Sequence, residues 1–145
     1  MFTHLLLPTD GSPLSEAAFF KGVAFAKECN ARITGVCVMP AFHVLTFDTV
    51  MLEDTKEEFL AESKAQAQKN LAVLQRAATE AGVLCEGVVE VSDHPYEAII
   101  RTADQKGCDL ILMASHGRRG MQGLLLGSET QKVLTHSRIP VLVYR

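Results

Sequence analysis

The chain has 145 residues, of which 48% are hydrophobic and 21% are charged, an ordinary balance for a globular protein. Its formal net charge of -3 at pH 7 excludes a general attraction to nucleic acid or to an acidic membrane surface. The amino-terminal apolar run is three leucines without a basic flank, too short for a signal peptide or a membrane span. We therefore expect one cytoplasmic domain, residues 1–145, without a nucleic-acid or membrane partner.

The four cysteines are scattered and form no Cys-x-x-Cys pair. Cys37 and Cys85 lie in apolar runs typical of strands, which favours packing in the core over redox chemistry. No pattern of zinc ligands is present in the sequence, so we expect no metal site built by the protein alone.

Short apolar runs alternate with helical patterns, which indicates βαβ units around a parallel sheet. The predicted strands are Thr3–Pro8, Arg32–Met39, Leu84–Val91, Asp109–Ser115 and Pro140–Tyr144. They are almost continuously apolar, as expected for strands covered by helices on both faces. Five strands joined by helical crossovers favour a doubly wound α/β fold with the strand order 3-2-1-4-5.

The predicted helices are Pro13–Cys29, Thr49–Ala81, Pro95–Lys106 and Glu129–His136. Ser12 is a favourable N-cap for the first of them, and Pro13 suits its first turn. The second carries an apolar stripe at helical spacing and is followed by Gly82, a typical stop. The stretch Pro40–Val50 is the least regular and indicates a loop, either a lid over a pocket or a partner surface.

In a doubly wound sheet, ligands bind beyond the carboxyl ends of the strands, where the winding direction reverses. With the predicted order, this point lies between the first and fourth strands. The first strand leads into Pro8-Thr9-Asp10-Gly11 and the fourth into Ala114-Ser115-His116-Gly117. We expect these distant segments to meet in one crevice, bordered by Cys37-Val38-Met39 at the end of the second strand.

The stretch ASHGRRGMQGLLLGSET, Ala114 to Thr130, carries glycines and two arginines between a buried strand and a helix start. Glycines let a backbone approach a phosphate closely. A helix N-terminus offers unpaired N–H groups and about half a positive charge to an anion. Together with the expected crevice, this stretch predicts a nucleotide site.

Each of these features also has a purely structural explanation. Asp10-Gly11 is a common turn sequence, and Ser128-x-x-Gln131 has the spacing of a capping box with the serine as N-cap. Arg118, Arg119 and His116 are compatible with a solvated loop. The stretch is neither a P-loop nor a dinucleotide fingerprint, and the chain has no nucleophile elbow of a hydrolase.

Three segments resemble the universal stress protein family: LLLPTDGS, ILMASHGRRGMQGLLLGS and GSETQKVLTHSRIPVLVYR. Together they extend the resemblance over essentially the whole chain. The nucleotide-binding branch of that family carries Gly-x2-Gly-x9-Gly-Ser/Thr, and here Gly117 is followed by nine residues and then by Gly127-Ser128. The resemblance implies a five-stranded α/β protein, usually a homodimer, that binds ATP with Mg²⁺ accompanying the phosphates; ADP and AMP are the alternative ligands that the sequence leaves open.

Carried over by position, the resemblance also implies the residues of the nucleotide site. Pro8, Thr9 and Asp10 would contact the adenosine, and Val38 would line the adenine. The other members lie in the glycine-bearing loop and the helix start after it: Met113, Ala114, Ser115, His116, Gly117, Arg118, Arg119, Gly120, Gly127, Ser128, Glu129 and Thr130.

Two positions depart from the family motif. Ala114 stands at the first glycine position, so a methyl group would lie where the backbone approaches the ligand. Glu129 would repel a triphosphate if it pointed inward, unless Arg118 and Arg119 offset its charge. Both departures favour one alternative, a nucleotide-free stress-related interaction protein. The other alternative is a slow ATPase or phosphotransferase.

The last predicted strand, Pro140–Tyr144, is an apolar sheet edge, which invites pairing with another chain. The family resemblance implies antiparallel pairing across a two-fold axis and hence a homodimer through residues 140–145. The alternative is an edge covered by loops. Other protein partners, and the stress to which the protein responds, are not specified by the sequence.

Overall fold

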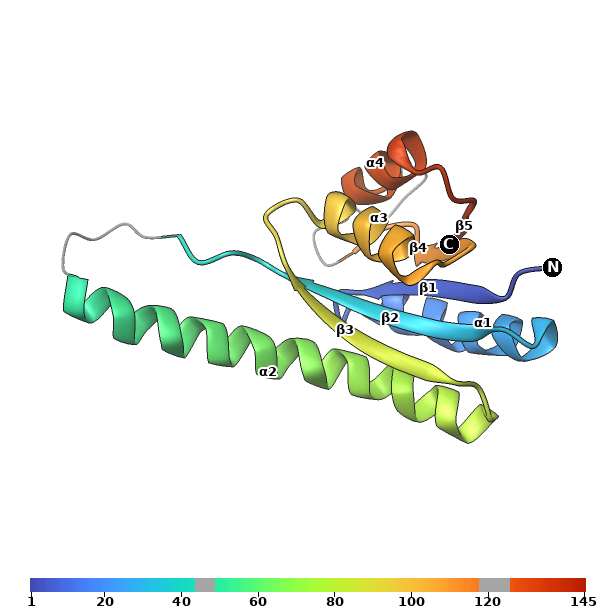
Figure 1. The fold of residues 1–145 in the computed structure, drawn as a ribbon, viewed down its shortest axis with the longest axis horizontal. Helices are drawn as coiled ribbons and strands as arrows, with labels where there is room; N and C mark the ends of the chain where they lie inside the picture. The colour runs from blue at the N-terminus through green and yellow to red at the C-terminus, as the bar shows by residue number, and fades with distance from the viewer. Residues whose placement is uncertain (44–48, 118–125) are drawn as a thin grey trace.

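The structure, a computed structural model, describes residues 1–43, 49–117 and 126–145, and for residues 49–54 it describes the backbone alone. Within these residues, five strands form an all-parallel sheet in the order β3-β2-β1-β4-β5 (Figure 1). The strands are β1 His4–Thr9, β2 Arg32–Met39, β3 Cys85–Val91, β4 Leu110–Ala114 and β5 Val141–Tyr144. The order confirms the predicted doubly wound α/β fold, and every strand ends within one residue of its predicted limits.

Helices cover both faces of the sheet. They are α1 Pro13–Cys29, α2 Thr49–Ala81, α3 Pro95–Lys106 and α4 Ser128–His136. α1 and α2 pack on one face, and α3 and α4 pack on the other (Figure 1). As predicted, the Ser12 side chain accepts a hydrogen bond from the Ser15 N–H (3.3 Å) and caps α1.

The core divides between the two faces because successive side chains of a strand point in opposite directions. Leu5 and Leu7 of β1 pack against α1, whereas Leu6 packs in the cluster that also holds Ile99 of α3 and Val133 of α4. The three leucines are fully buried. This burial on both sides explains why the strand sequences are apolar without alternation.

The second half of α2 packs on the sheet, and its first half extends past it (Figure 1). Leu71 and Leu74 are buried over β2, where Gly35 makes room for them: a Cβ on Gly35 would lie 2.5 Å from Leu74 Cδ2. In the described part of the chain, no helix combines the length and apolar character needed to cross a membrane.

The amino end of the sheet is held by the Asp109 carboxylate. Its Oδ2 accepts hydrogen bonds from the Thr3 N–H (2.8 Å) and the Thr3 hydroxyl (3.0 Å), and its Oδ1 accepts one from the His4 N–H (3.0 Å). Burial raises the pKa of Asp109, but these donors outweigh burial and hold the pKa below its ordinary value. The start of β1 is thereby tied to the start of β4.

A second polar network lies beside it. Thr34 Oγ1 donates to Glu86 Oε1 (3.0 Å), so His4 Nε2 is the donor in its 2.7 Å contact with Thr34 Oγ1. The hydrogen bond from Lys106 Nζ to Glu86 Oε2 (3.1 Å) lowers the pKa of Glu86. Burial lowers the pKa of His4, which favours the neutral ring at pH 7.

Candidate functional site

A cavity of about 710 Å³ opens at the carboxyl end of the sheet. It is formed by the ends of β1, β2 and β4, the starts of α1, α3 and α4, and the middle of α2. The sequence-predicted site residues that line it are Pro8, Thr9, Asp10, Val38, Met113, Ala114, His116, Gly117, Gly127, Ser128, Glu129 and Thr130. Ser115 is not among the lining residues, and Arg118, Arg119 and Gly120 lie outside the described residues.

The structure brings the two distant segments together, as expected from the strand order. β1 and β4 are neighbours, with Leu5 opposite Leu110. Beyond their ends, Asp10 and Gly117 are so close that a Cβ on Gly117 would collide with Asp10 Oδ2. The absence of a side chain at Gly117 thus leaves room for the Asp10 side chain from the other loop.

The β1–α1 connection is a tight turn. Asp10 Oδ1 accepts a hydrogen bond from the Ser12 N–H (2.9 Å), and Thr9 Oγ1 accepts one from the Gly11 N–H (3.0 Å). Gly11 has a φ of 76°, in the left-handed region that glycine tolerates best. The turn explanation of Asp10-Gly11 is thus correct, and the same turn forms part of the cavity wall.

The start of α4 differs from the capping box that the sequence predicted. Gly127 is the N-cap and provides no side-chain hydrogen bond, and Ser128 is already the first helical residue. Gln131 Nε2 donates to the Leu126 carbonyl (2.8 Å). The cap is set by tertiary packing, because the Gly127 N–H donates to the Ser115 carbonyl (2.8 Å).

Within the described residues, the start of α4 has no side-chain cap, which leaves donors at the cavity. The hydrogen bond from the Gln131 N–H to the Gly127 carbonyl (3.0 Å) is the first step of the helical ladder in α4. The N–H groups of Ser128, Glu129 and Thr130 precede that step, and all three residues line the cavity. This end of the cavity suits an anion.

Ala114, the first departure from the family motif, is the last residue of β4. It is 7% exposed and belongs to the core cluster between the sheet and α1. Its carbonyl accepts a hydrogen bond from Thr130 Oγ1 (3.0 Å), and Thr130 is itself buried. Ala114 therefore anchors α4 to the end of β4 as well as lining the cavity.

Ser115 lies beneath the cavity and connects two elements. Its N–H donates to the Tyr144 carbonyl of β5 (2.7 Å), and its carbonyl accepts the Gly127 N–H at the start of α4. Its hydroxyl lies 3.2 Å from His116 Nδ1. Ser115 is 5% exposed and does not line the cavity wall.

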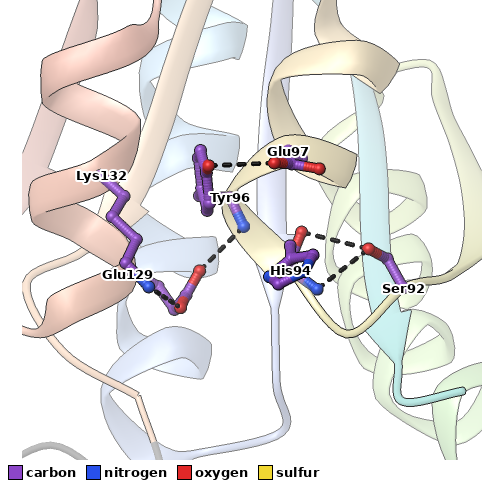
Figure 2. Close-up of polar contacts among 6 residues, drawn as sticks. All are labelled: Ser92, His94, Tyr96, Glu97, Glu129 and Lys132. Carbon is purple, nitrogen blue, oxygen red and sulfur yellow. Dashed lines mark hydrogen bonds and ion pairs between the residues drawn. The ribbon is translucent and has the colours of Figure 1, made fainter.

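Glu129, the second departure, is engaged by protein groups (Figure 2). Its Oε2 accepts a hydrogen bond from the Tyr96 N–H in the first turn of α3 (2.9 Å), and its Oε1 lies 3.3 Å from Lys132 Nζ. His94, the N-cap residue of α3, provides no side-chain cap. Glu129 therefore caps α3 from α4, and Lys132 offsets its charge.

Sequence reasoning missed the contribution of α2 to the cavity. Ser63, Gln66 and Asn70 line it from the middle of this helix. Gln66 Nε2 donates to Asn70 Oδ1 (3.0 Å), and Asn70 Nδ2 lies 3.8 Å from the sulfur of buried Cys37. The sequence did contain a signal for this contribution. Positions 63, 66 and 70 lie on the same side of the helix as Ala67 of the apolar stripe, so they are expected to lie near the sheet.

The loop after β3 was also missed, and it borders the cavity with Ser92 and Asp93. Asp93 Oδ1 accepts a hydrogen bond from the Ala41 N–H (3.2 Å), and Asp93 Oδ2 lies 2.7 Å from His43 Nε2. The His43 hydrogen bond lowers the pKa of Asp93. These contacts tie the first residues of the predicted Pro40–Val50 loop to the loop after β3; residues 44–48 lie outside the described part.

The described lining is acidic, with Asp10, Asp93 and Glu129 and without lysine or arginine. Among the described residues, no three side chains of the His, Cys, Asp and Glu types are placed to hold a metal ion. A polyanionic ligand would therefore need a cation that arrives with it or comes from outside the described lining.

Comparison with known proteins identifies the relatives of this chain. The Universal stress protein family profile matches residues 1–145. Universal stress protein YxiE of Bacillus subtilis is 32% identical over 149 residues, covering 100% of both chains. The structure of hypothetical protein MJ0577, from Methanocaldococcus jannaschii, has a TM-score of 0.83 and 26% identity, covering 99% of this chain and 95% of that one.

A universal stress protein in complex with cAMP has the same fold. Its TM-score is 0.72 at 23% identity, covering 99% of this chain and 97% of that chain. At this identity the likeness carries the fold alone.

Proposed function

The chain belongs to the universal stress protein family, and from that premise we propose that it is a cytoplasmic, ATP-binding regulatory module of the stress response. The observation that carries the proposal is the meeting of two distant predicted segments at one cavity, at the end of the sheet where this fold class binds ligands. Residues 1–145 act together as one nucleotide-binding domain in this proposal.

The phosphates lie at the start of α4 in the proposed complex. The N–H groups of Ser128, Glu129 and Thr130 precede the helical ladder and are available to oxygen acceptors. Gly117 and Gly127 carry no side chain between the backbone and the ligand. The family resemblance adds Arg118, Arg119 and Gly120 to the residues expected around the ribose and phosphates.

The adenosine occupies the other part of the cavity in this proposal. Pro8, Thr9 and Asp10 line it from the end of β1, and Val38 lines it from β2. Met113, Ala114 and His116 complete the wall on the β4 side. An apolar wall beside a few fixed polar groups is typical of small-molecule sites.

Mg²⁺ accompanies the phosphates rather than occupying a protein cage. The acidic lining suits a cation, but the described residues offer no three-ligand cluster. Mg²⁺ is commonly held by substrate phosphates, water and one or two carboxylates. It would neutralise phosphate charge beside Asp10 and Glu129.

The structural roles of the Asp10 and Glu129 carboxylates favour nucleotide binding over nucleotide hydrolysis. Asp10 accepts the Ser12 N–H inside its turn, and Glu129 accepts the Tyr96 N–H at α3. A general base must reach the proton that it removes. Both carboxylates are oriented by structural hydrogen bonds, which supports a regulatory site.

Nucleotide binding is tested on the purified protein in two ways. Denaturation followed by chromatography is expected to release an adenine nucleotide, and calorimetry of nucleotide-free protein with Mg-ATP is expected to show saturable heat. Absence of a released nucleotide, together with absence of heat for ATP, ADP and AMP, would contradict the proposal and favour a nucleotide-free interaction protein.

We also propose a homodimer through residues 140–145. Within the described residues, β5 pairs with β4 alone and Leu142 is 39% exposed. The carbonyls of Pro140 and Tyr144 accept N–H groups of the β4 side, so the alternate residues Val141 and Val143 present their backbone groups to the open edge. Such an edge is a template for another strand.

The dimer is tested with Val143→Pro, which removes an edge donor and keeps the hydrogen bonds to β4. Light scattering after size exclusion is expected to show a dimer for the wild type and a folded monomer for the variant. Leu84→Ala, at an exposed position just before β3 on the opposite edge, is the matched control and is expected to remain dimeric. A wild-type monomer, or a variant that stays dimeric, would refute this interface.

A further inference from the structure

An amide pair on α2 faces the cavity from the side opposite α4. We infer that this pair, Gln66 and Asn70, recognises the base of the bound nucleotide and makes the site selective for adenine over 6-oxo purines. The inference rests on the proposed nucleotide binding and adds to it the residues that determine base specificity.

The topology sets the direction of the ligand. α4 follows β4, and α2 packs on β2 and β3, while β2 and β4 flank β1 on opposite sides. A nucleotide whose phosphates lie at the start of α4 therefore extends its base across β1 toward β2 and α2. The lining there includes Cys37, Val38 and Met39 with Gln66 and Asn70.

The Asn70 side chain is fixed by its surroundings. It packs against the β1–α1 turn, where a Cβ on Gly11 would lie 2.6 Å from Asn70 Oδ1. Its Nδ2 is 3.8 Å from Cys37 Sγ, and its Oδ1 accepts the Gln66 Nε2 hydrogen bond of 3.0 Å. Two strand ends thus hold Asn70, and Asn70 in turn orients Gln66.

This orientation determines which groups remain for a ligand. Because Gln66 donates through Nε2 to Asn70, its Oε1 is left as an acceptor, and Asn70 keeps an N–H donor on Nδ2. A donor beside an acceptor is the arrangement that asparagine and glutamine use to bind adenine at N6 and N7. Guanine offers O6 and N7, two acceptors, which arginine or lysine recognises.

The rest of the described lining agrees with this selectivity, because it contains neither arginine nor lysine. A 6-oxo group would face the acceptor Gln66 Oε1 where adenine presents its amino group. An i, i+4 amide pair also stabilises a helix by itself. The experiment must therefore separate base recognition from a structural role.

The test compares ATP with inosine triphosphate, which replaces the 6-amino group by a 6-oxo group. Calorimetry on nucleotide-free full-length protein is expected to give the wild type about tenfold preference for ATP. Gln66→Leu is expected to weaken ATP about tenfold and leave inosine triphosphate within about twofold, whereas Asn70→Leu is expected to weaken both nucleotides, because both purines keep the N7 acceptor. Gln68→Leu, exposed on the same helix and outside the cavity lining, is the matched control and should behave as wild type.

A second variant tests the same idea by gain of binding. Gln66→Lys replaces the acceptor by a donor and is expected to reverse the preference toward inosine triphosphate. Melting temperatures of all variants show whether the fold is retained.

The outcomes distinguish the inference from the proposed function. Equal wild-type affinity for both nucleotides, or an ATP preference that survives in both leucine variants, overturns the inference while nucleotide binding stands. Equal loss of both nucleotides in Gln66→Leu assigns the pair a structural role and also overturns it. If the wild type binds neither nucleotide, the proposed function and the inference fail together.

Discussion

At the amino end of the sheet polar groups are used to hold strands together, whereas at the carboxyl end they surround a cavity. Asp109 alone accepts three hydrogen bonds from the start of β1. At the other end, α4 begins at Gly127 without a side-chain cap, beside about 710 Å³ of open space. The stabilising network and the proposed ligand site thus lie at opposite ends of the same sheet.

The two helix starts near the cavity repeat this contrast on a smaller scale. α3 receives the Glu129 carboxylate at its Tyr96 N–H, so its first turn is satisfied by the protein (Figure 2). α4 receives no equivalent side chain within the described residues. One helix start is closed by a neighbour, and the other is left available to a ligand.

The largest expected effect comes from filling the carboxyl end. A Cβ on Gly127 would lie 3.1 Å from His116 Cα and 3.3 Å from the Ser115 carbonyl oxygen. Gly127→Val should shift this loop, lower ATP affinity about 100-fold, and cost about 1–3 kcal/mol of stability. Calorimetry and chemical denaturation measure the two effects.

The matched control for this variant is Gly87→Val in β3. A Cβ there meets the flexible end of Gln75 at 2.9 Å, and Gly87 does not line the cavity. ATP affinity should be unchanged in the control. Unchanged affinity in Gly127→Val as well would show that the close approach at Gly127 is unimportant for binding.

The amino end is tested by Asp109→Asn. Loss of the charged acceptor should cost about 1–2 kcal/mol at neutral pH and leave ATP affinity unchanged. The folded-state pKa of Asp109 lies below its unfolded value, so its contribution is present above about pH 4 and is lost as pH falls through the folded pKa.

Urea denaturation across this pH range should therefore show a smaller acid-induced loss of stability in Asp109→Asn than in the wild type. Asp104→Asn, exposed on α3, is the control and should keep the wild-type slope. A parallel pH dependence for wild type and Asp109→Asn would contradict the role assigned to this carboxylate.

A smaller effect is expected from Thr130→Val, which keeps the side-chain shape but removes the hydrogen bond to the Ala114 carbonyl. The loss should be about 1 kcal/mol, because a buried carbonyl is left without its partner. Thr135→Val removes an exposed hydrogen bond to Gln131 in the same helix and should change the melting temperature less. Equal shifts in both variants would argue against a special anchor at Thr130.

The smallest effect is expected from Glu129→Gln. The neutral amide weakens the cap on α3 by about 0.5 kcal/mol and removes negative charge beside the proposed phosphates. Stability should fall slightly while ATP affinity rises about twofold. Glu62→Gln, exposed on α2, should change neither quantity. A lower ATP affinity in Glu129→Gln would mean that the carboxylate itself assists binding.

The sequence predicted the strands and the meeting of the Asp10 and Gly117 loops because these depend on local patterns and on one topological rule. Strand limits followed from apolar runs, and Ser12 with Pro13 marked the start of α1. The crevice followed from the strand order alone, without any knowledge of side-chain contacts.

The wrong and missing predictions concern features that are determined by tertiary contacts rather than by local sequence. The capping-box spacing indicates Ser128 as an N-cap, but packing against His116 and Ser115 moves the cap to Gly127. The Tyr96 partner of Glu129 is 33 positions away in sequence and has no local signature. In the sequence alone, Gln66 and Asn70 have the character of solvent-facing helix residues. The packing of α2 beside the strand ends is what places them at the cavity.

One consequence follows from Ser115, the residue buried under the cavity. Its N–H donates to the carbonyl of Tyr144, the last residue of β5 (2.7 Å), and its carbonyl accepts the Gly127 N–H (2.8 Å). A change in the position of Gly127 therefore reaches the outermost strand through only two backbone links. If that strand also joins two subunits, ligand binding and subunit association are thermodynamically linked. The factor by which ligand occupancy changes the association constant then equals the factor by which association changes the ligand affinity.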